Sequence, residues 1–213
     1  MVKQGFRNLS VAEQERVLEA ALDEFADKEY EAASLNRIIQ NAGISKGSMY
    51  HYFQNKEDLY MYILSTVMEE KKQFLMHTLP TLVKPNHELG LFETISLQLE
   101  ISITFARANP RYHMINTHLQ NMPDSALKHK IWGHFEEEFD RMVYAMVEKA
   151  IECGELREDM DKKFIMRVLR FMLLKFTDFY PDYQELLKMS DEVMQGEMKL
   201  LMKFLKHGLR GPK

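Results

Sequence analysis

Apolar residues along this chain recur at intervals of three and four rather than at every second position. That spacing places them on one face of an α-helix, whereas a half-buried strand alternates apolar and polar residues. Only 9 Gly and 6 Pro interrupt the 213 residues, so few turns are available to connect a series of short strands. The pattern predicts an all-α fold.

Three helical patterns occupy the N-terminal part of the chain. Ser10 precedes the first pattern and Glu13 stands three residues later, a spacing that predicts a capping box. Ser34 begins the second pattern, and Gly43 ends it with the backbone freedom that a tight turn needs. Ser45 begins the third. The order predicts two short helices joined by a glycine turn, with one longer helix before them.

The third pattern divides its side chains between two faces. Met49, Tyr52 and Phe53 fall at i, i+3 and i+4, so they point inward. The opposite face carries small, polar and aromatic side chains, namely Lys46, Gly47, Ser48, Tyr50 and His51. These outward residues are the candidates for recognition of a partner.

Charge distinguishes the same part of the chain. The segment 34–56 has three cationic side chains and no acid, which leaves 25 cations against 32 acids in the rest of the protein. A small basic surface on an acidic protein is what contact with nucleic-acid phosphates requires. The sequence pI of about 6.1 argues against a general polyanion binder, which spreads positive charge widely. We therefore expect a focused contact with nucleic acid.

Two short helices around a glycine turn match the helix-turn-helix plan, in which the second helix enters the major groove. Residues 42–53 have the sequence Ala-Gly-Ile-Ser-Lys-Gly-Ser-Met-Tyr-His-Tyr-Phe, and residues 55–59 have Asn-Lys-Glu-Asp-Leu. With the preceding amphipathic helix, these motifs resemble the TetR-type bacterial transcription regulators over residues 10–63. The resemblance implies a helix-turn-helix DNA-binding domain over 1–55 and a larger helical ligand-binding and dimerisation domain over 56–213.

The resemblance also implies roles for single residues at the DNA. A fourth helical pattern begins at Asn55 and Lys56. Hydroxyl groups, and Lys56 at this helix start, are expected to bind phosphates, together with the amides at the start of the third helix. The long side chains of the third helix are expected to face the bases or the adjacent backbone, and its glycine allows a close approach. The DNA-binding residues predicted in this way are Ser34, Ser45, Lys46, Gly47, Ser48, Tyr50, His51 and Lys56.

The second part of the chain is richer in Met and aromatic residues. Its helical patterns lie near 88–107, 110–121, 124–153, 161–179 and 190–207. With 16 Met in the chain, the interior has many flexible, polarisable side chains, which suit a pocket that repacks around apolar or aromatic ligands. An ordinary core explains any single one of them equally well. The candidate ligand-binding residues are Phe92, Phe105, Tyr112, Trp132, Phe135 and Phe139.

The last two helical patterns are apolar on more than one face. A helix with so wide an apolar arc needs partners on two sides, and the resemblance implies that the last helices form a dimeric four-helix bundle. The alternative is a deeper core within one chain. The candidate dimer residues are Ile165, Val168, Leu169, Met172, Phe176, Val193, Leu200, Leu201 and Phe204.

Two patterns in the sequence could indicate an enzyme, and the spacing of the residues argues against both. Residues 43–47 match the G-x-S-x-G pattern of serine hydrolases, but that motif needs a strand before the serine, and helical spacing precedes it here. The pairs His113 with His118 and His129 with His134 are spaced i, i+5, so they do not share a helix face for a metal. No Glu-x-x-His occurs, which argues against a di-iron carboxylate bundle. We expect no catalytic residue, metal or cofactor.

A single cysteine, Cys153, excludes an intramolecular disulfide and suits a reducing compartment. No segment approaches the ~18 apolar residues of a membrane span, and the N-terminus has no apolar run of signal-peptide length. We expect a cytoplasmic, ligand-responsive repressor that binds a near-palindromic DNA operator as a homodimer and responds to a small apolar or aromatic effector. The alternatives are an all-α enzyme or ligand-binding protein that retains a helix-turn-helix, and a module that binds an acidic partner.

Overall fold

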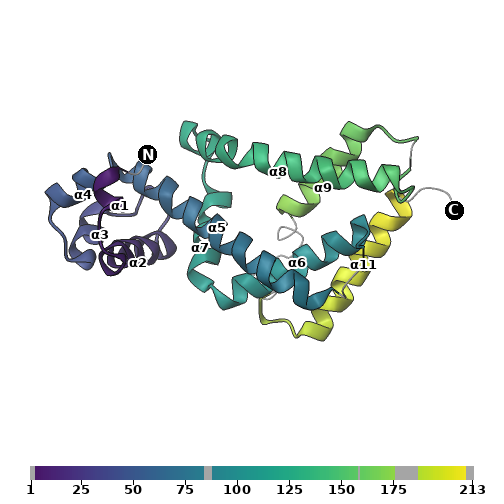
Figure 1. Cartoon of the computed structure of the whole chain (residues 1–213), viewed down its shortest axis with the longest axis horizontal. Helices are drawn as coiled ribbons and strands as arrows, with labels where there is room; N and C mark the ends of the chain where they lie inside the picture. Colours follow the sequence, from purple (N-terminus) through teal and green to yellow (C-terminus); the bar gives the residue numbers. More distant parts are fainter. Residues whose placement is uncertain (1–2, 84–87, 158, 176–186, 210–213) are drawn as a thin grey trace. The chain divides into compact units, whose positions relative to one another are not determined.

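The computed structural model describes residues 3–83, 88–157, 159–175 and 187–209, and the regular elements of this part of the chain are helices (Figure 1). The all-α prediction is confirmed. The helices are α1 (Gln4–Arg7), α2 (Val11–Asp27), α3 (Leu35–Ala42), α4 (Lys46–Tyr52), α5 (Lys56–Leu82), α6 (Leu91–Ala108), α7 (Pro110–Asn121), α8 (Ala126–Glu152), α9 (Lys162–Lys175) and α11 (Asp191–Leu209). None of these helices is long and apolar enough to cross a membrane.

The helix starts in the N-terminal region follow from local side-chain chemistry. The backbone N–H of Ser10 donates to the Glu13 carboxylate at 3.0 Å, and the Glu13 N–H donates to the Ser10 hydroxyl at 3.4 Å. This pair forms the predicted capping box of α2. At the start of α5, the Asp58 N–H donates to Oδ1 of Asn55 at 2.8 Å. The short helix α1 is not predicted by the sequence pattern.

The chain divides into two compact units. The first unit comprises residues 1–73 and 106–131, so it holds α1 to α4, most of α5, and α7. The second unit comprises residues 74–105 and 132–213, so it holds most of α6 and of α8, together with α9 and α11. The predicted functional boundary after residue 55 stays a prediction.

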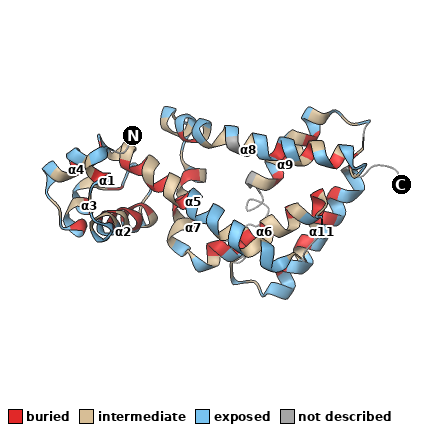
Figure 2. Ribbon diagram, in the orientation of Figure 1, coloured by how far each residue is buried: buried red, intermediate tan, exposed pale blue. Residues whose placement is uncertain are grey.

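The first unit has its own apolar core. In Figure 1, α2, α3 and α4 gather around the start of α5. Each contributes a side chain that is 1% exposed or less, namely Phe25, Ile38, Met49 and Leu59. In Figure 2, buried and exposed positions alternate along the ribbons of these helices. The burial leaves the opposite face of α4 in solvent.

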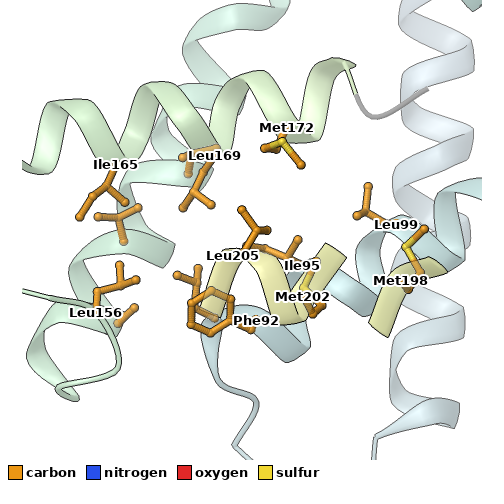
Figure 3. Close-up of a cluster of buried hydrophobic side chains, with 14 of the residues drawn as sticks. Phe92, Ile95, Leu99, Leu156, Ile165, Leu169, Met172, Met198, Met202 and Leu205 are labelled. Carbon is orange, nitrogen blue, oxygen red and sulfur yellow. The ribbon is translucent and has the colours of Figure 1, made fainter. Parts of the chain in front are cut away.

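The second unit is built around one apolar cluster, part of which is drawn in Figure 3. Helices α6, α8, α9 and α11 all contribute to it. Four of its buried members are methionines of α9 and α11, namely Met172, Met194, Met198 and Met202. The Met-rich part of the sequence therefore forms a packed core in this structure.

Candidate nucleic-acid interface

The turn between α3 and α4 depends on a glycine. Gly43 has φ of 66°, a left-handed conformation that side chains with a Cβ rarely adopt. Its N–H donates to the carbonyl of Gln40 at 3.1 Å, and the N–H of Ile44 donates to the carbonyl of Ile39 at 3.2 Å. These bonds satisfy the last carbonyls of α3 and turn the chain toward α4. The predicted glycine turn is confirmed.

Serine side chains begin both helices of the pair. The Ser34 hydroxyl accepts from the N–H of Arg37 at 3.3 Å, and the Ser45 hydroxyl accepts from the N–H of Ser48 at 2.9 Å. The hydroxyls of Ser45 and Ser48 lie 2.8 Å apart, so one of them donates to the other. The structure gives Ser34 and Ser45 capping roles, and phosphate binding by all three serines stays a prediction.

A buried carboxylate joins α2 to the start of α3. Glu24 is 3% exposed, and its Oε1 accepts from the Ser34 N–H at 2.8 Å. Its Oε2 lies 3.6 Å from Nε of Arg37. A buried charge is costly unless it is paired and hydrogen-bonded, and both conditions are met here. The bond fixes where α3 begins, a role that the sequence pattern does not reveal.

The outer face of α4 presents the residues predicted to face DNA. Lys46, Gly47 and His51 are exposed, and Tyr50 is 44% exposed. A Cβ built on Gly47 meets one neighbour, the Ser45 hydroxyl, at 3.7 Å, which is an ordinary contact. The protein itself therefore does not require a glycine at this position, and an approaching partner gives a physical reason for one.

Lys56 occupies a different position from the predicted phosphate contact. Its ammonium donates to the carbonyls of Tyr30, Glu31 and Ala33 at 2.7, 3.3 and 3.1 Å, and it lies 4.4 Å from the centre of the Tyr30 ring. A lysine ammonium has three N–H donors, so these bonds use all of them. In this structure Lys56 anchors the loop between α2 and α3 instead of presenting its charge to a phosphate.

Helix α1 lies against the C-terminal end of α4. The N–H of Lys3 donates to the carbonyl of Tyr52 at 3.1 Å, and its ammonium donates to the carbonyl of Tyr50 at 2.8 Å. Phe6 is fully buried, and its ring centre lies 5.0 Å from that of Phe53. Sequence reasoning missed this contact because one aromatic residue in a four-residue helix produces no periodicity.

Helix α7 packs in the first unit through polar contacts with α2. The Arg111 guanidinium lies 2.6 Å from a carboxylate oxygen of Glu19 and 2.7 Å from one of Asp23. These carboxylates raise the pKa of Arg111 above its usual range by hydrogen bonding. Nδ1 of His118 lies 3.1 Å from the carbonyl oxygen of Phe25, so Nδ1 donates in this bond. Two residues of α7 outside the motif, Arg111 and His118, thus hold α2 in place.

The candidate ligand residues are divided between the two units. Phe92 and Phe105 are buried in the second unit, whereas Tyr112 belongs to α7 in the first unit. The three aromatic residues of α8, Trp132, Phe135 and Phe139, are partly buried. Ligand binding by these residues stays a prediction.

An open groove of about 620 Å³ lies between α6 and α11, and Phe92 is the ligand candidate that lines it. The groove also has three lysines on its α11 side and one acid, Glu93, on its α6 side. Its lining residues are Phe92, Glu93, Ser96, Lys199, Met202, Lys203, Lys206 and His207.

The candidate dimer residues divide into two groups. Ile165, Leu169 and Met172 are at most 8% exposed, and Figure 3 shows them pointing from α9 into the cluster of the second unit. Val168 and Leu201 pack partly against the same cluster. The structure therefore corrects the assignment of Ile165, Leu169 and Met172 to a dimer face, because partners within the chain already cover them. The assignment of Val168 and Leu201 stays a prediction. Phe176 lies outside the described residues.

The second group of candidates is exposed on α11. Val193, Leu200 and Phe204 are 51%, 64% and 74% exposed and recur at i, i+7 and i+11, so they share one helix face. The helical period places this face away from the buried methionines of the same helix, Met194, Met198 and Met202. Helix α9 likewise exposes Phe164 and Phe171. These apolar faces have the character expected of a surface that a partner covers.

Known proteins resemble this chain in both sequence and fold. The family model for bacterial regulatory proteins of the tetR family matches residues 17–63. The uncharacterized HTH-type transcriptional regulator YvdT of Bacillus subtilis is 24% identical over 198 residues, which cover 92% of this chain and 94% of that protein. The likewise uncharacterized regulator YhgD of the same organism is 34% identical over 65 residues, which cover 30% of this chain and 34% of that protein.

A solved structure extends the likeness to the whole chain. A TetR family transcriptional regulator from Chloroflexus aurantiacus has a TM-score of 0.70 and 27% identity, with 100% of each chain covered. The helix-turn-helix geometry, the match of its motif and this likeness over the full length agree with one another. Residues 17–63 therefore match the tetR family of bacterial regulatory proteins, and the whole chain has the fold of a TetR family transcriptional regulator.

Proposed function

We propose that this protein is a transcriptional repressor that binds a near-palindromic DNA operator as a homodimer and releases it when a small apolar or aromatic effector binds. The outer face of α4 carries the DNA-binding part of this proposal. Lys46, Gly47, Tyr50 and His51 are exposed together on one short helix, whose inward residue Met49 is 1% exposed. A rigid helix that presents long polar side chains around a glycine suits the major groove.

Phosphate contacts on either side of α4 would set its register on the duplex. The Ser34 hydroxyl accepts the Arg37 N–H, and that bond does not use the hydroxyl proton of Ser34. The Ser45 and Ser48 hydroxyls share one proton between them, so the other proton points elsewhere. Each hydroxyl proton is a donor that suits a phosphate oxygen. Lys56 makes no such contact in our proposal, because its three donors hold the α2–α3 loop.

Homodimerisation is supported by the apolar face of α11. Leu200 and Phe204 are among the most exposed large apolar side chains of the described residues. A second copy would cover the same face by two-fold symmetry. The dimer would present two copies of α4 to successive major grooves, which lie about 34 Å apart along the duplex.

An effector would act on the second unit. Met172, Met194, Met198 and Met202 lie within its cluster, and their unbranched side chains repack easily around an apolar guest. A ligand that favours one packing of the cluster shifts the population of conformations that fit the operator. A coupling of only ~1 to 3 kcal/mol is sufficient for regulation of this kind.

The variants Lys46→Ala and Tyr50→Ala test the DNA-binding assignment. A lost base or backbone contact costs about 1.4 kcal/mol at each half-site, so the dimer should lose about 100-fold in specific affinity. Gel-shift titration on an operator that the wild-type protein selects from a random duplex library measures the loss. Sedimentation velocity should show that both variants keep the dimer.

Lys163→Ala is the matched control, because Lys163 is an exposed lysine of α9 far along the chain from α4. It should leave operator affinity unchanged. Wild-type affinity should also fall steeply with salt concentration, since phosphate contacts release counterions. Unchanged affinity in both α4 variants would overturn the proposed function.

A further inference from the structure

The C-terminal end of α4 is completed by a segment from the beginning of the chain. The last carbonyls of a helix have no N–H partner within it. Lys3 supplies donors to two of them here, because its N–H bonds the carbonyl of Tyr52 at 3.1 Å and its ammonium bonds that of Tyr50 at 2.8 Å. The ammonium also lies at the negative end of the helix dipole. Lys3 therefore restrains the last turn of the recognition helix.

Phe6 fixes this segment to the first unit. Its ring is fully buried and lies in edge or tilted contact with three other rings. The ring centres of Tyr52, Phe53 and Tyr62 are 5.9, 5.0 and 5.6 Å from that of Phe6. Because Tyr62 belongs to α5 and Phe53 ends α4, α1 joins both helices. The aromatic cluster holds α1 at a defined distance from the outer face of α4.

The imidazole of His51 lies directly against the backbone of Gly5. A Cβ added to Gly5 would lie 2.4 Å from Nε2 of His51 and 2.5 Å from its Cδ2. Such distances are far below van der Waals contact, so any other residue at this position displaces the ring. His51 also makes an edge contact with Tyr52, with ring centres 5.9 Å apart. Gly5 and Tyr52 thus confine the ring from two sides.

We propose that α1 is a positioning element of the DNA-binding surface, in which Gly5 leaves the space that holds the His51 ring in the orientation for DNA contact. The inference rests on the proposed function, because it needs α4 to enter the major groove. A ring that is already held in place loses less conformational freedom on binding than a freely rotating one. Gly5 is a positioning residue, since it acts through His51.

The variant Gly5→Ala isolates this effect. The atoms in the way belong to the end of a rotatable side chain, so the ring moves and the fold stays intact. Alanine also suits a helix better than glycine, so the melting temperature should not fall. Operator affinity should fall about five- to tenfold, the equivalent of one lost polar contact. Gly133→Ala is the matched control, because a Cβ there meets no atom within 4 Å.

A double-mutant cycle with His51→Ala supplies a readout that a structural effect would not give. If Gly5 acts through His51, the double variant Gly5→Ala/His51→Ala should bind no more weakly than His51→Ala alone. The imidazole proton resonances of His51 should shift in Gly5→Ala and stay in place in Gly133→Ala. Losses that multiply in the double variant would overturn the inference.

Lys46→Ala in the same titration separates this inference from the proposed function. A large loss in Lys46→Ala with wild-type affinity in Gly5→Ala would overturn the role of α1 alone. No loss in either variant, with salt-independent binding, would overturn the proposed function and the inference together. A loss of operator affinity in both variants, with a non-additive double-mutant cycle, supports the proposed function and the inference.

Discussion

The two compact units of this protein differ in the side chains that they bury. Glu24 and His113 are the buried polar or charged residues among those described, and both lie in the first unit. The buried residues of the second unit's cluster are all apolar, and four of the 16 are methionines. Both units have an apolar core, and the first unit adds a buried carboxylate and a buried imidazole to it.

The difference matters because the two units face different demands. Hydrogen bonds such as that from the Ser34 N–H to Glu24 place a helix start to within a fraction of an ångström. A surface that must fit a DNA groove requires that accuracy. Methionine contacts allow several packings of similar free energy, which suits a unit that must respond to a ligand. The exposed faces differ in the same way, since α4 shows polar groups and α11 shows apolar ones.

The apolar face of α11 should give the largest effect. We expect Leu200→Glu combined with Phe204→Glu to place charges in the proposed dimer interface and to give monomers in sedimentation velocity. Operator affinity should fall by about 10² to 10⁴, because the two half-sites are no longer bound by one linked molecule. Met76→Glu is the control, since Met76 is 59% exposed on a different helix. A dimeric double variant would show that this face has another purpose.

The buried histidine of the first unit should make the protein sensitive to acid. Burial lowers the pKa of His113 to about 4, compared with 6.5 in the unfolded chain. Between these pH values the unfolded state binds a proton that the folded state does not, so stability falls as the pH decreases from about 6.5 to about 4. The expected contribution is about 2 kcal/mol between pH 7.5 and pH 5.

Urea unfolding at both pH values measures this difference. The variant His113→Leu should lose about 2 kcal/mol less than the wild type over the same interval, because leucine has no proton to bind. The same pH dependence in wild type and variant would mean that the acid sensitivity arises from other groups. Burial of His113 would then not contribute to the pH dependence of the first unit's stability.

Gly47 should give the smallest effect, with opposite signs for stability and binding. A Cβ at this position makes one ordinary contact within the protein, so Gly47→Ala should be neutral or stabilising by up to about 0.5 kcal/mol. The added methyl group would instead meet the DNA, and operator affinity should fall about tenfold. Thermal melting and gel-shift titration measure the two quantities. Gly133→Ala should be stabilising without the loss of binding.

Local features of the fold were predictable because they depend on residues three or four apart. The capping box of Ser10 and Glu13, the cap at Ser45 and the glycine turn are all of this kind. Each is formed by side chains and amides that the sequence places within one helical turn. The outward face of α4 follows from the same period, and Lys46, Gly47, Tyr50 and His51 are exposed as predicted.

Features that depend on distant residues were missed or misread. Lys3 bonds a carbonyl 47 positions away, and Lys56 bonds carbonyls 23 to 26 positions before it. Lys56 was expected to bind phosphate because it stands at a helix start, but its direction depends on where the α2–α3 loop lies. Glu24 resembles any other acid of an exposed helix until the start of α3 is placed beside it.

The sequence by itself determined the helical fold, the helix-turn-helix and the basic segment, because helix periodicity and capping are local properties. It left open which apolar face of α9 and of α11 is buried, since both faces carry large apolar side chains. The tertiary structure decided that Ile165, Leu169 and Met172 face the core and that Leu200 and Phe204 face solvent. It also decided that Gly5 lies against His51. Such contacts join residues far apart in the chain, and only the packing of the whole unit determines which of them form.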